Sequence, residues 1–331
     1  MSDPKDIWVI IEHADGAVKP VCLEAVHAAR QLSSKSGGQV KAVYLGSQGD
    51  DGVKAVARAG VHQVLLIVDP ELKTYTSSRY LAALLGCIDD APPSAILLAA
   101  TNHGKELASA LATSLGSGLA TDCVGLDYSE STGIKVERPV YAGKALSYMG
   151  FLDSEPIVIT LRPNAFRPDS IENANEAPIS EHSPQWSESS LLLHLKEIVK
   201  GVGKLDITEA RIVVSGGLGM QGPENFHLLE ELADVLGAAV GSSRPVVDNG
   251  WRDYSNQVGQ TGRTVGPDLY IACGISGAVQ HLAGMSSSKC IVAINKDPNA
   301  AIFDVADYGI VGDALQILPI LTQEFKKALQ A

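Results

Sequence analysis

Short apolar runs alternate with amphipathic segments over the first 115 residues, and this alternation limits the possible folds more than any other feature of the chain. Apolar runs of strand length occur at 8–11, 40–45, 63–68 and 95–99, and each precedes a segment of helical periodicity, at 22–32, 53–59, 77–88 and 104–115. Strands that alternate with helices form parallel sheets, because each helix returns the chain to the edge where the previous strand began. The sequence therefore predicts a parallel-sheet α/β domain at the N-terminus.

The pattern changes after residue 117. From residue 118 to residue 161 the apolar runs are short, rich in β-branched residues and separated by turns. Such runs predict antiparallel strands appended to the parallel sheet. Residues 167–190 are rich in Pro, Ser, Asn and Glu, and we expect an irregular connection there.

A second alternating series begins at Arg211 and continues to the C-terminus. Its apolar runs lie near Val213, Ala239, Ile271, Val292 and Ile310, and its helical segments lie near Leu229, Ala278 and Leu318. The chain of 331 residues also exceeds the roughly 250–300 residues at which a single core stops growing. We therefore predict two domains, an N-terminal α/β domain at residues 1–200 and a doubly wound C-terminal domain at residues 204–331.

Composition excludes several classes of function. The net charge of −12 repels the phosphates of nucleic acids, so nucleic acid is not an expected partner. No apolar run approaches the roughly 20 residues that span a bilayer, and the start of the chain does not resemble a signal peptide. We expect no membrane insertion and a cytoplasmic location, although a mitochondrial matrix protein without its transit peptide would look the same. The cysteines and histidines show no C-x-x-C, H-x-H or H-x-x-x-H spacing, so no metal site is predicted.

One segment of the second series predicts a nucleotide site. The apolar run Leu269–Cys273 leads into Gly274-Ile275-Ser276-Gly277, and a helical segment follows. This order aims backbone amides and a helix dipole at a phosphate. Gly216-Gly217-Leu218-Gly219 follows another apolar run, but the next strand ends in Ser243-Arg244 instead of the acidic residue that an NAD site requires. A basic strand end suits a phosphate or an electron-rich ring, whereas a tight turn without a ligand is the alternative.

Several blocks carry a resemblance to one family over almost the whole chain. They are Val258–Gly262, Leu269–Met285, Ile291–Asp297 and Ala306–Asp313 in the second half, and Gly118–Cys123, Arg138–Lys144 and Thr160–Phe166 in the first. In this order the blocks resemble the alpha subunits of electron transfer flavoproteins. The resemblance implies one FAD, bound in the doubly wound C-terminal domain, and a beta subunit that forms a heterodimer with this chain.

The resemblance also implies which residues surround the flavin ring. Ser243 and Arg244 match a serine and an arginine beside the ring, and a planar guanidinium can stabilise the negative charge of a reduced flavin. The loop Val258-Gly259-Gln260-Thr261 matches the segment near N5 and O4, and His281 matches the histidine near O2. Of these, Arg244, Thr261 and His281 are the residues expected to act on the ring.

The same resemblance assigns the rest of the cofactor. The amides of Ser276, Gly277, Ala278, Val279 and Gln280 are expected at the pyrophosphate. Asn295 and Asp313, with the adjoining Ala314, are expected at the adenosine end. Many members have arginine where this chain has Leu218, so that contact is lost or is supplied by Arg211 or by the partner.

For the reaction, the resemblance implies a carrier that accepts electrons from acyl-CoA dehydrogenases and other flavin dehydrogenases and passes them to a membrane-bound quinone oxidoreductase. No nucleophile motif or acid/base constellation is evident in the sequence, which suits a carrier.

Two alternatives stay open. One is an electron-bifurcating flavoprotein with a second FAD in the beta subunit, which oxidises NADH and reduces ferredoxin or flavodoxin together with a higher-potential acceptor; Arg244-Pro245 and Gly250-Trp251 resemble that branch. The other is a regulatory module that binds a nucleotide such as ATP and transfers no electrons.

Overall fold

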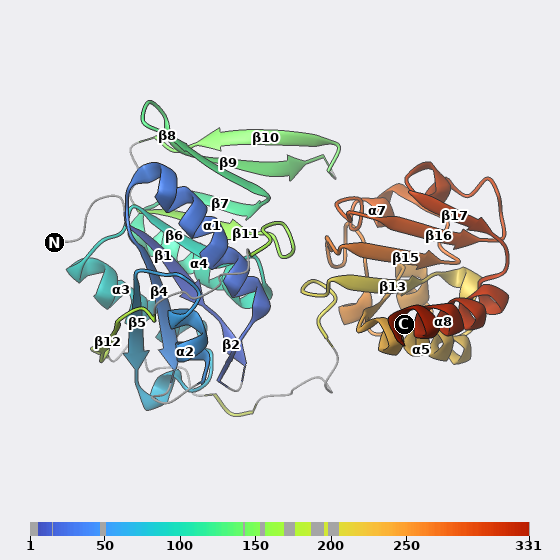
Figure 1. Ribbon diagram of the computed structural model, residues 1–331, viewed down its shortest axis with the longest axis horizontal. Coiled ribbons are helices and arrows are strands. Elements are labelled where there is room, and N and C mark those ends of the chain that lie inside the picture. Colours follow the sequence, from blue (N-terminus) through green and yellow to red (C-terminus); the bar gives the residue numbers. More distant parts are fainter. Residues whose placement is uncertain are drawn as a thin grey trace. The chain divides into compact units, whose positions relative to one another are not determined.

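The computed structural model describes residues 6–14, 16–46, 51–141, 143–152, 156–168, 176–186, 195–197 and 205–330. The chain forms two compact units (Figure 1). Unit 1 comprises residues 1–139 and 146–199, and unit 2 comprises residues 140–145 and 200–331. The domain boundary predicted at residues 200–204 lies outside the described residues.

A seven-stranded parallel sheet forms the centre of unit 1, in the order β12-β5-β4-β1-β6-β11-β7 (Figure 1). The strands are β1 (Ile7–Ile11), β4 (Val40–Gly46), β5 (Gln63–Val68), β6 (Ala95–Ala99), β7 (Leu119–Cys123), β11 (Ile157–Leu161) and β12 (Ile179–His182). All five residues of β1, Ile-Trp-Val-Ile-Ile, are buried, as expected for a central parallel strand with helices on both faces. The predicted parallel α/β sheet is confirmed.

Four helices cover the two faces of this sheet. They are α1 (Pro20–Ser36), α2 (Asp51–Ala57), α3 (Ser77–Asp90) and α4 (Asn102–Leu115). Helices α1 and α2 contribute to one apolar cluster with one face of the sheet, and α3 and α4 to a second cluster with the other face. Helix α1 begins at Pro20, whose fixed φ suits a first helical turn, and ends at Gly37 with φ of 82°.

Two parts of unit 1 differ from the sequence prediction. Strands β7 and β11 join the parallel sheet, because the five residues of β11 are all buried and need cover on both faces. Only β8 (Gly125–Ser129), β9 (Gly133–Val140) and β10 (Ala145–Gly150) form a separate sheet, in which β8 and β9 are antiparallel. Strand β12 lies within the segment predicted to be irregular and pairs in parallel with β5. A sheet edge can order such a polar strand through backbone hydrogen bonds alone.

The described part of unit 1 also contains two short strands and a 3₁₀ turn: β2 (His13–Ala14), β3 (Ala17–Val18) and η1 (Pro70–Leu72).

Unit 2 is built on a five-stranded parallel sheet in the order β14-β13-β15-β16-β17. The strands are β13 (Ile212–Gly216), β14 (Ala239–Ser242), β15 (Leu269–Cys273), β16 (Ile291–Asn295) and β17 (Tyr308–Val311). In chain order this is 2-1-3-4-5, the order of a doubly wound sheet. The chain leaves β13 toward one edge and β15 toward the other, so a topological switch point lies between them. The predicted doubly wound domain is confirmed.

Helices α5 (His227–Leu236) and α8 (Ala314–Gln330) pack on one face of this sheet. The opposite face is covered by loops, the single turn α7 (Val279–Leu282) and the 3₁₀ turn η6 (Ala301–Asp304). The remaining elements are α6 (Arg244–Asp248), η3 (Leu218–Met220), η4 (Pro223–Phe226) and η5 (Tyr254–Asn256). Among all the helices of the described residues, none is long and apolar enough to cross a bilayer.

Candidate functional site

A cavity of about 490 Å³ opens at the carboxyl edge of the sheet in unit 2. Its walls are Gly217–Gly219 after β13, Ser243–Pro245 after β14, Gly274–Ser276 after β15, and Asn295 at the end of β16, together with residues 257–261 and Ala278, Gln280 and His281. The loops after β13 and β15 flank the switch point of the sheet, which is where open α/β sheets bind their ligands. The volume is in the range of a small-molecule or cofactor site.

Glycines pack the loops after β13 and β15 directly against each other. A Cβ on Gly217 would lie 2.2 Å from the Gly274 carbonyl oxygen, and a Cβ on Gly219 would lie 2.6 Å from the Gly274 Cα. Gly274 itself has φ of +62°, a left-handed conformation that glycine adopts without strain. These glycines are therefore required by contact between the two loops, and they bring both walls of the cavity together.

The loop after β15 presents five consecutive amides, from Ser276 to Gln280. Within the described residues these five amides donate to no protein acceptor. Helix α7 has only four residues, and so short a helix contributes little dipole. Helix α7 ends at Leu282. Gly284 then packs against the backbone of Gly259, since a Cβ on Gly284 would lie 2.3 Å from the Gly259 nitrogen. Unpaired consecutive amides of this kind can bind an anion without a helix dipole.

The loop from residue 257 to residue 263 is held by its own hydrogen bonds. The Gln257 carbonyl accepts from the Arg263 amide at 2.7 Å, and the Gln260 amide donates to the Gln280 carbonyl at 2.7 Å. The buried Gln257 side chain donates from Nε2 to the Thr261 hydroxyl oxygen at 3.1 Å. This bond leaves the Thr261 O–H free to donate at the cavity wall.

Ser243 and Arg244 bring a hydroxyl and a charge to the cavity wall. The Ser243 side chain does not cap α6, although the residue is at the N-cap position, so its hydroxyl remains available. The Arg244 side chain is 62% exposed, and its Nε lies 3.3 Å from an Asp248 carboxylate oxygen. Arg244 is thus a partly solvated positive charge in the wall of the cavity.

His281 is the buried polar group of the wall. Burial lowers the pKa of His281 to about 4, and the nearby Val258 carbonyl opposes this shift. The ring is therefore uncharged at neutral pH. Its Nε2 lies 2.9 Å from the Tyr270 hydroxyl. Its Nδ1 is buried and has no hydrogen bond of good geometry in the described part of the chain, and the Val258 carbonyl near the ring is a protein acceptor for a proton there.

Known proteins match this chain over nearly its full length. Residues 7–185 match the electron transfer flavoprotein domain, and residues 206–286 match the electron transfer flavoprotein FAD-binding domain. The electron transfer flavoprotein subunit alpha of Thermoanaerobacterium thermosaccharolyticum is 41% identical over 328 residues, which are 99% of each chain. The chain belongs to the electron transfer flavoprotein alpha-subunit family. The corresponding Bacillus subtilis subunit is 42% identical over 98% of each chain, and Protein FixB of Clostridium saccharobutylicum is 38% identical over 100% of this chain and 99% of its own.

FAD is the cofactor of this family, and the cavity of unit 2 fits it. The unpaired amides from Ser276 to Gln280 suit a pyrophosphate. Arg244 adds a positive charge at the same wall. When bound, FAD supplies a ring that accepts and releases electrons, and these groups would hold it and set its electrostatic surroundings.

The cavity brings most of the predicted cofactor residues together, and their individual roles stay predictions. Eleven of them line it: Ser243, Arg244, Val258, Gly259, Gln260, Thr261, Ser276, Ala278, Gln280, His281 and Asn295. Four do not: Gly277, Val279, Asp313 and Ala314. A carboxylate oxygen of Asp313 accepts from the Leu315 amide at 3.0 Å and so caps α8. Asn295 uses its amide group to hold the Ile275 carbonyl and the Asp297 amide.

Seven further lining residues were not predicted as cofactor contacts: Gly217, Leu218, Gly219, Pro245, Gln257, Gly274 and Ile275. For the glycines, the signal was present in the sequence, because each follows an apolar strand. For Gln257 no feature of the sequence indicated a role. Only the structure shows that its side chain is buried and donates a hydrogen bond to the Thr261 hydroxyl.

Leu218 lines the cavity as an apolar, half-exposed side chain. The suggestion that Arg211 replaces an arginine there is wrong. Arg211 precedes β13 and bonds to Asp268 at 2.6 Å, so it lies at the amino edge of the sheet. A strand of five residues separates it from the cavity by roughly 16 Å.

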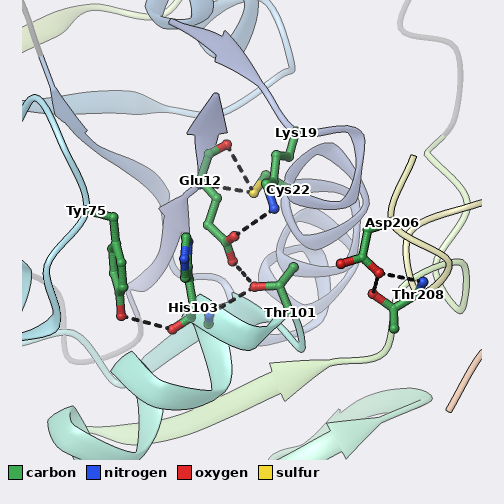
Figure 2. A network of polar contacts seen from close by, with 9 residues as sticks. Glu12, Lys19, Cys22, Tyr75, Thr101, His103, Asp206 and Thr208 are labelled. Carbon is green, nitrogen blue, oxygen red and sulfur yellow. Dashed lines mark hydrogen bonds and ion pairs between the residues drawn. The ribbon is translucent and has the colours of Figure 1, made fainter. Parts of the chain in front are cut away.

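Unit 1 has its own switch point between β1 and β6, and internal side chains fill it (Figure 2). Glu12 follows β1 and Thr101 follows β6, and the Thr101 hydroxyl donates to Glu12 Oε1 at 2.5 Å. The same hydroxyl accepts from the Gly104 amide at 2.9 Å and caps α4. The Lys19 ammonium lies 3.5 Å from the other Glu12 oxygen. The carboxylate of Glu12 thus lies at the helix N-terminus where an anionic ligand binds in many related sheets.

We expect Thr101→Ala to destabilise unit 1 by about 1–2 kcal/mol, because it removes an N-cap and one donor to a largely buried carboxylate. FAD content should not change, since the cavity is lined by residues of unit 2 alone. Thr113→Ala on the exposed face of the same helix is the matched control. Hydrogen exchange of the α4 and β6 amides measures the effect, and equal protection in the two variants would contradict it.

Proposed function

We propose that this chain carries FAD in an alpha/beta heterodimer that takes electrons from flavin dehydrogenases, including acyl-CoA dehydrogenases, and passes them to a membrane-bound quinone oxidoreductase. The observation that supports a carrier most directly is the chemistry of the cavity wall. It contains no carboxylate and no thiol, and its only imidazole has a pKa lowered to about 4. Such a wall offers no acid or base that works near neutral pH, so the residues bind and tune the ring instead of transforming a substrate.

The donors and acceptors in this proposal follow from the family resemblance, and a direct experiment separates the carrier from a bifurcating protein. The chain is co-expressed with its beta subunit, and the purified complex is analysed for flavin content and titrated with NADH under anaerobic conditions. The carrier should contain one FAD, resist reduction by NADH and be reduced by an acyl-CoA dehydrogenase with its substrate. Two FAD with reduction by NADH would overturn the proposal in favour of bifurcation. A colourless complex that binds ATP would instead indicate a regulatory module.

We expect Arg244→Ala to lower the reduction potential of the bound flavin. Two unit charges in contact interact by about 1 kcal/mol in water and about 4 kcal/mol at an effective dielectric constant of ~20, which corresponds to about 40–170 mV. Because the Arg244 side chain is 62% exposed and lies beside the Asp248 carboxylate, the lower half of that range applies, about 40–100 mV. Arg244→Lys should keep part of the effect. Anaerobic spectroelectrochemistry on the FAD-loaded heterodimer measures the shift.

Arg211→Ala is the matched control for this prediction, since it removes the same charge from unit 2 at the opposite edge of the sheet. Its potential should equal that of the unchanged protein. If Arg244→Ala and Arg211→Ala give the same potential, Arg244 is only a surface residue.

A further inference from the structure

Tyr270 and His281 form a buried pair at the wall of the FAD cavity. Tyr270 lies on β15 and is fully buried, and its hydroxyl oxygen lies 2.9 Å from His281 Nε2. The ring centroids are 6.1 Å apart and the ring planes are inclined by 59°. The two residues therefore meet through a hydroxyl and a ring nitrogen and are not stacked.

The protonation of both residues determines the direction of this hydrogen bond. Burial raises the pKa of Tyr270, so its hydroxyl keeps its proton. Burial lowers the pKa of His281, so its ring is neutral and carries a single N–H. If the hydroxyl donates to Nε2, the ring proton must be on Nδ1. The Val258 carbonyl near the ring can only accept, which also favours a ring N–H beside it.

Ser215 is the other hydroxyl near Tyr270. It lies on β13, which pairs with β15, and it is close enough to lower the pKa of Tyr270. Its hydroxyl oxygen is nevertheless buried without a hydrogen bond of good geometry in the described part of the chain. The well-formed bond of the Tyr270 hydroxyl is the one to His281.

We propose that Tyr270 is a positioning residue whose hydroxyl fixes the tautomer of His281, so that Nδ1 carries the ring proton at the wall of the FAD cavity. The Nδ1 proton then faces the Val258 carbonyl, and Val258 and His281 both line the cavity. The tautomer thus holds the loop that carries Val258 against the His281 ring. With the other tautomer, His281 would present a lone pair to the Val258 carbonyl, and the two acceptors would repel each other. The inference rests on the same cavity as the proposed function.

The tautomer is measured first in the unchanged protein. Histidine labelled with ¹⁵N is incorporated into the alpha chain of the heterodimer, and the ¹⁵N chemical shifts distinguish a protonated from an unprotonated ring nitrogen. The His281 signals are assigned by their loss in His281→Gln. We expect a protonated Nδ1 and an unprotonated Nε2. A protonated Nε2 would overturn the inference, whether or not any variant folds.

The second measurement removes the hydroxyl with Tyr270→Phe. Without its donor, Nε2 should become protonated in a substantial fraction of molecules, the reduction potential of the flavin should change, and the dissociation constant of FAD should rise about two- to tenfold, the effect of one net hydrogen bond. Tyr80→Phe removes a buried hydroxyl that bonds to Leu45 and Leu72 in unit 1 and is the matched control. Ser215→Ala removes the other hydroxyl near Tyr270 and should leave the tautomer unchanged.

Unchanged ¹⁵N shifts and an unchanged potential in Tyr270→Phe would show that Tyr270 only packs the core. A loss of the Nδ1 proton in Ser215→Ala would overturn the assignment of His281 as the acceptor of the Tyr270 proton. These outcomes are distinct from failure of the proposed function, because the tautomer is read from His281 itself and does not depend on which proteins exchange electrons with the flavin.

Discussion

Gly277→Ala is expected to destabilise unit 2 by about 2–5 kcal/mol and to weaken FAD binding at least about tenfold. Gly277 has φ of +85°, and a Cβ there would lie 2.2 Å from the Ile302 nitrogen and 2.6 Å from the Ile302 Cα. The backbone conformation costs an alanine about 1–2 kcal/mol, and overpacking against a rigid backbone costs about 1–3 kcal/mol more. Relief of the clash moves Ile302, whose amide donates to the Ser276 carbonyl at 3.1 Å, and so moves the amides that we expect to face the pyrophosphate.

Gly250→Ala separates the two costs. Gly250 has φ of +71° in the same unit, but no atom lies within 4 Å of the Cβ that alanine would add. Gly250→Ala should therefore lower the free energy of unfolding of unit 2 only by the cost of the backbone conformation, about 1–2 kcal/mol. Its affinity for FAD should not change. Hydrogen exchange of the β15 amides, with and without FAD, and equilibrium dialysis of FAD measure both effects. Equal losses in the two variants would show that contact with Ile302 does not explain the glycine.

Acid sensitivity of unit 2 is expected to come largely from His281. Its pKa is about 4 in the folded chain and 6.5 in the reference state, so the unfolded state binds more protons between these values. Stability that is fully present above pH 6.5 is then lost as the pH falls toward 4. The difference between the two pKa values corresponds to about 3 kcal/mol in the free energy of unfolding. Protonation of His281 also places an uncompensated charge in the cavity wall, which should release FAD.

His281→Gln should be less stable than the unchanged protein at pH 7 and should lose much less stability between pH 6.5 and pH 4. His227→Gln, on the exposed start of α5, should retain the acid sensitivity of the unchanged protein. The free energy of unfolding of unit 2, followed by hydrogen exchange of the β13 and β15 amides across this pH range, gives the comparison. Parallel pH profiles for His281→Gln and the unchanged protein would exclude His281 as the source.

The switch point of unit 1 shows that the same topology can be used in two ways in one chain. In unit 2 the loops beyond β13 and β15 enclose a cavity with unpaired amides and a neutral imidazole in its wall. In unit 1 the corresponding position after β1 and β6 holds the Glu12 carboxylate, bonded to Thr101 and paired with Lys19 (Figure 2). The chain's own anion therefore stabilises α4 where a ligand's anion stabilises a helix in other proteins.

Periodicity determined most of the fold. The alternation of apolar runs and amphipathic segments predicts the eight strands and helices β1, α1, β4, α2, β5, α3, β6 and α4, as well as all five strands of unit 2. It succeeds because strands buried on both faces must be continuously apolar and helices on a sheet must be amphipathic. It fails for β7 and β11, which were predicted to be antiparallel, because only the neighbouring strand decides the direction of pairing. It also fails for β12, because this polar strand at the sheet edge lacks an apolar pattern.

For the site, the sequence by itself determined the family, the cofactor and the loops that form the cavity, because motifs that follow parallel strands must meet at the carboxyl edge of the sheet. Only the tertiary structure decided how the residues work there. It shows that Asp313 caps the N-terminus of α8 and that Arg211 lies at the amino edge of the sheet, away from the cavity. It also shows that Gly277 packs against the backbone of Ile302. It also reveals the bond from Tyr270 to His281. Burial, hydrogen-bond geometry and the ionisation that follows from them depend on residues distant in sequence, so no local pattern can specify them.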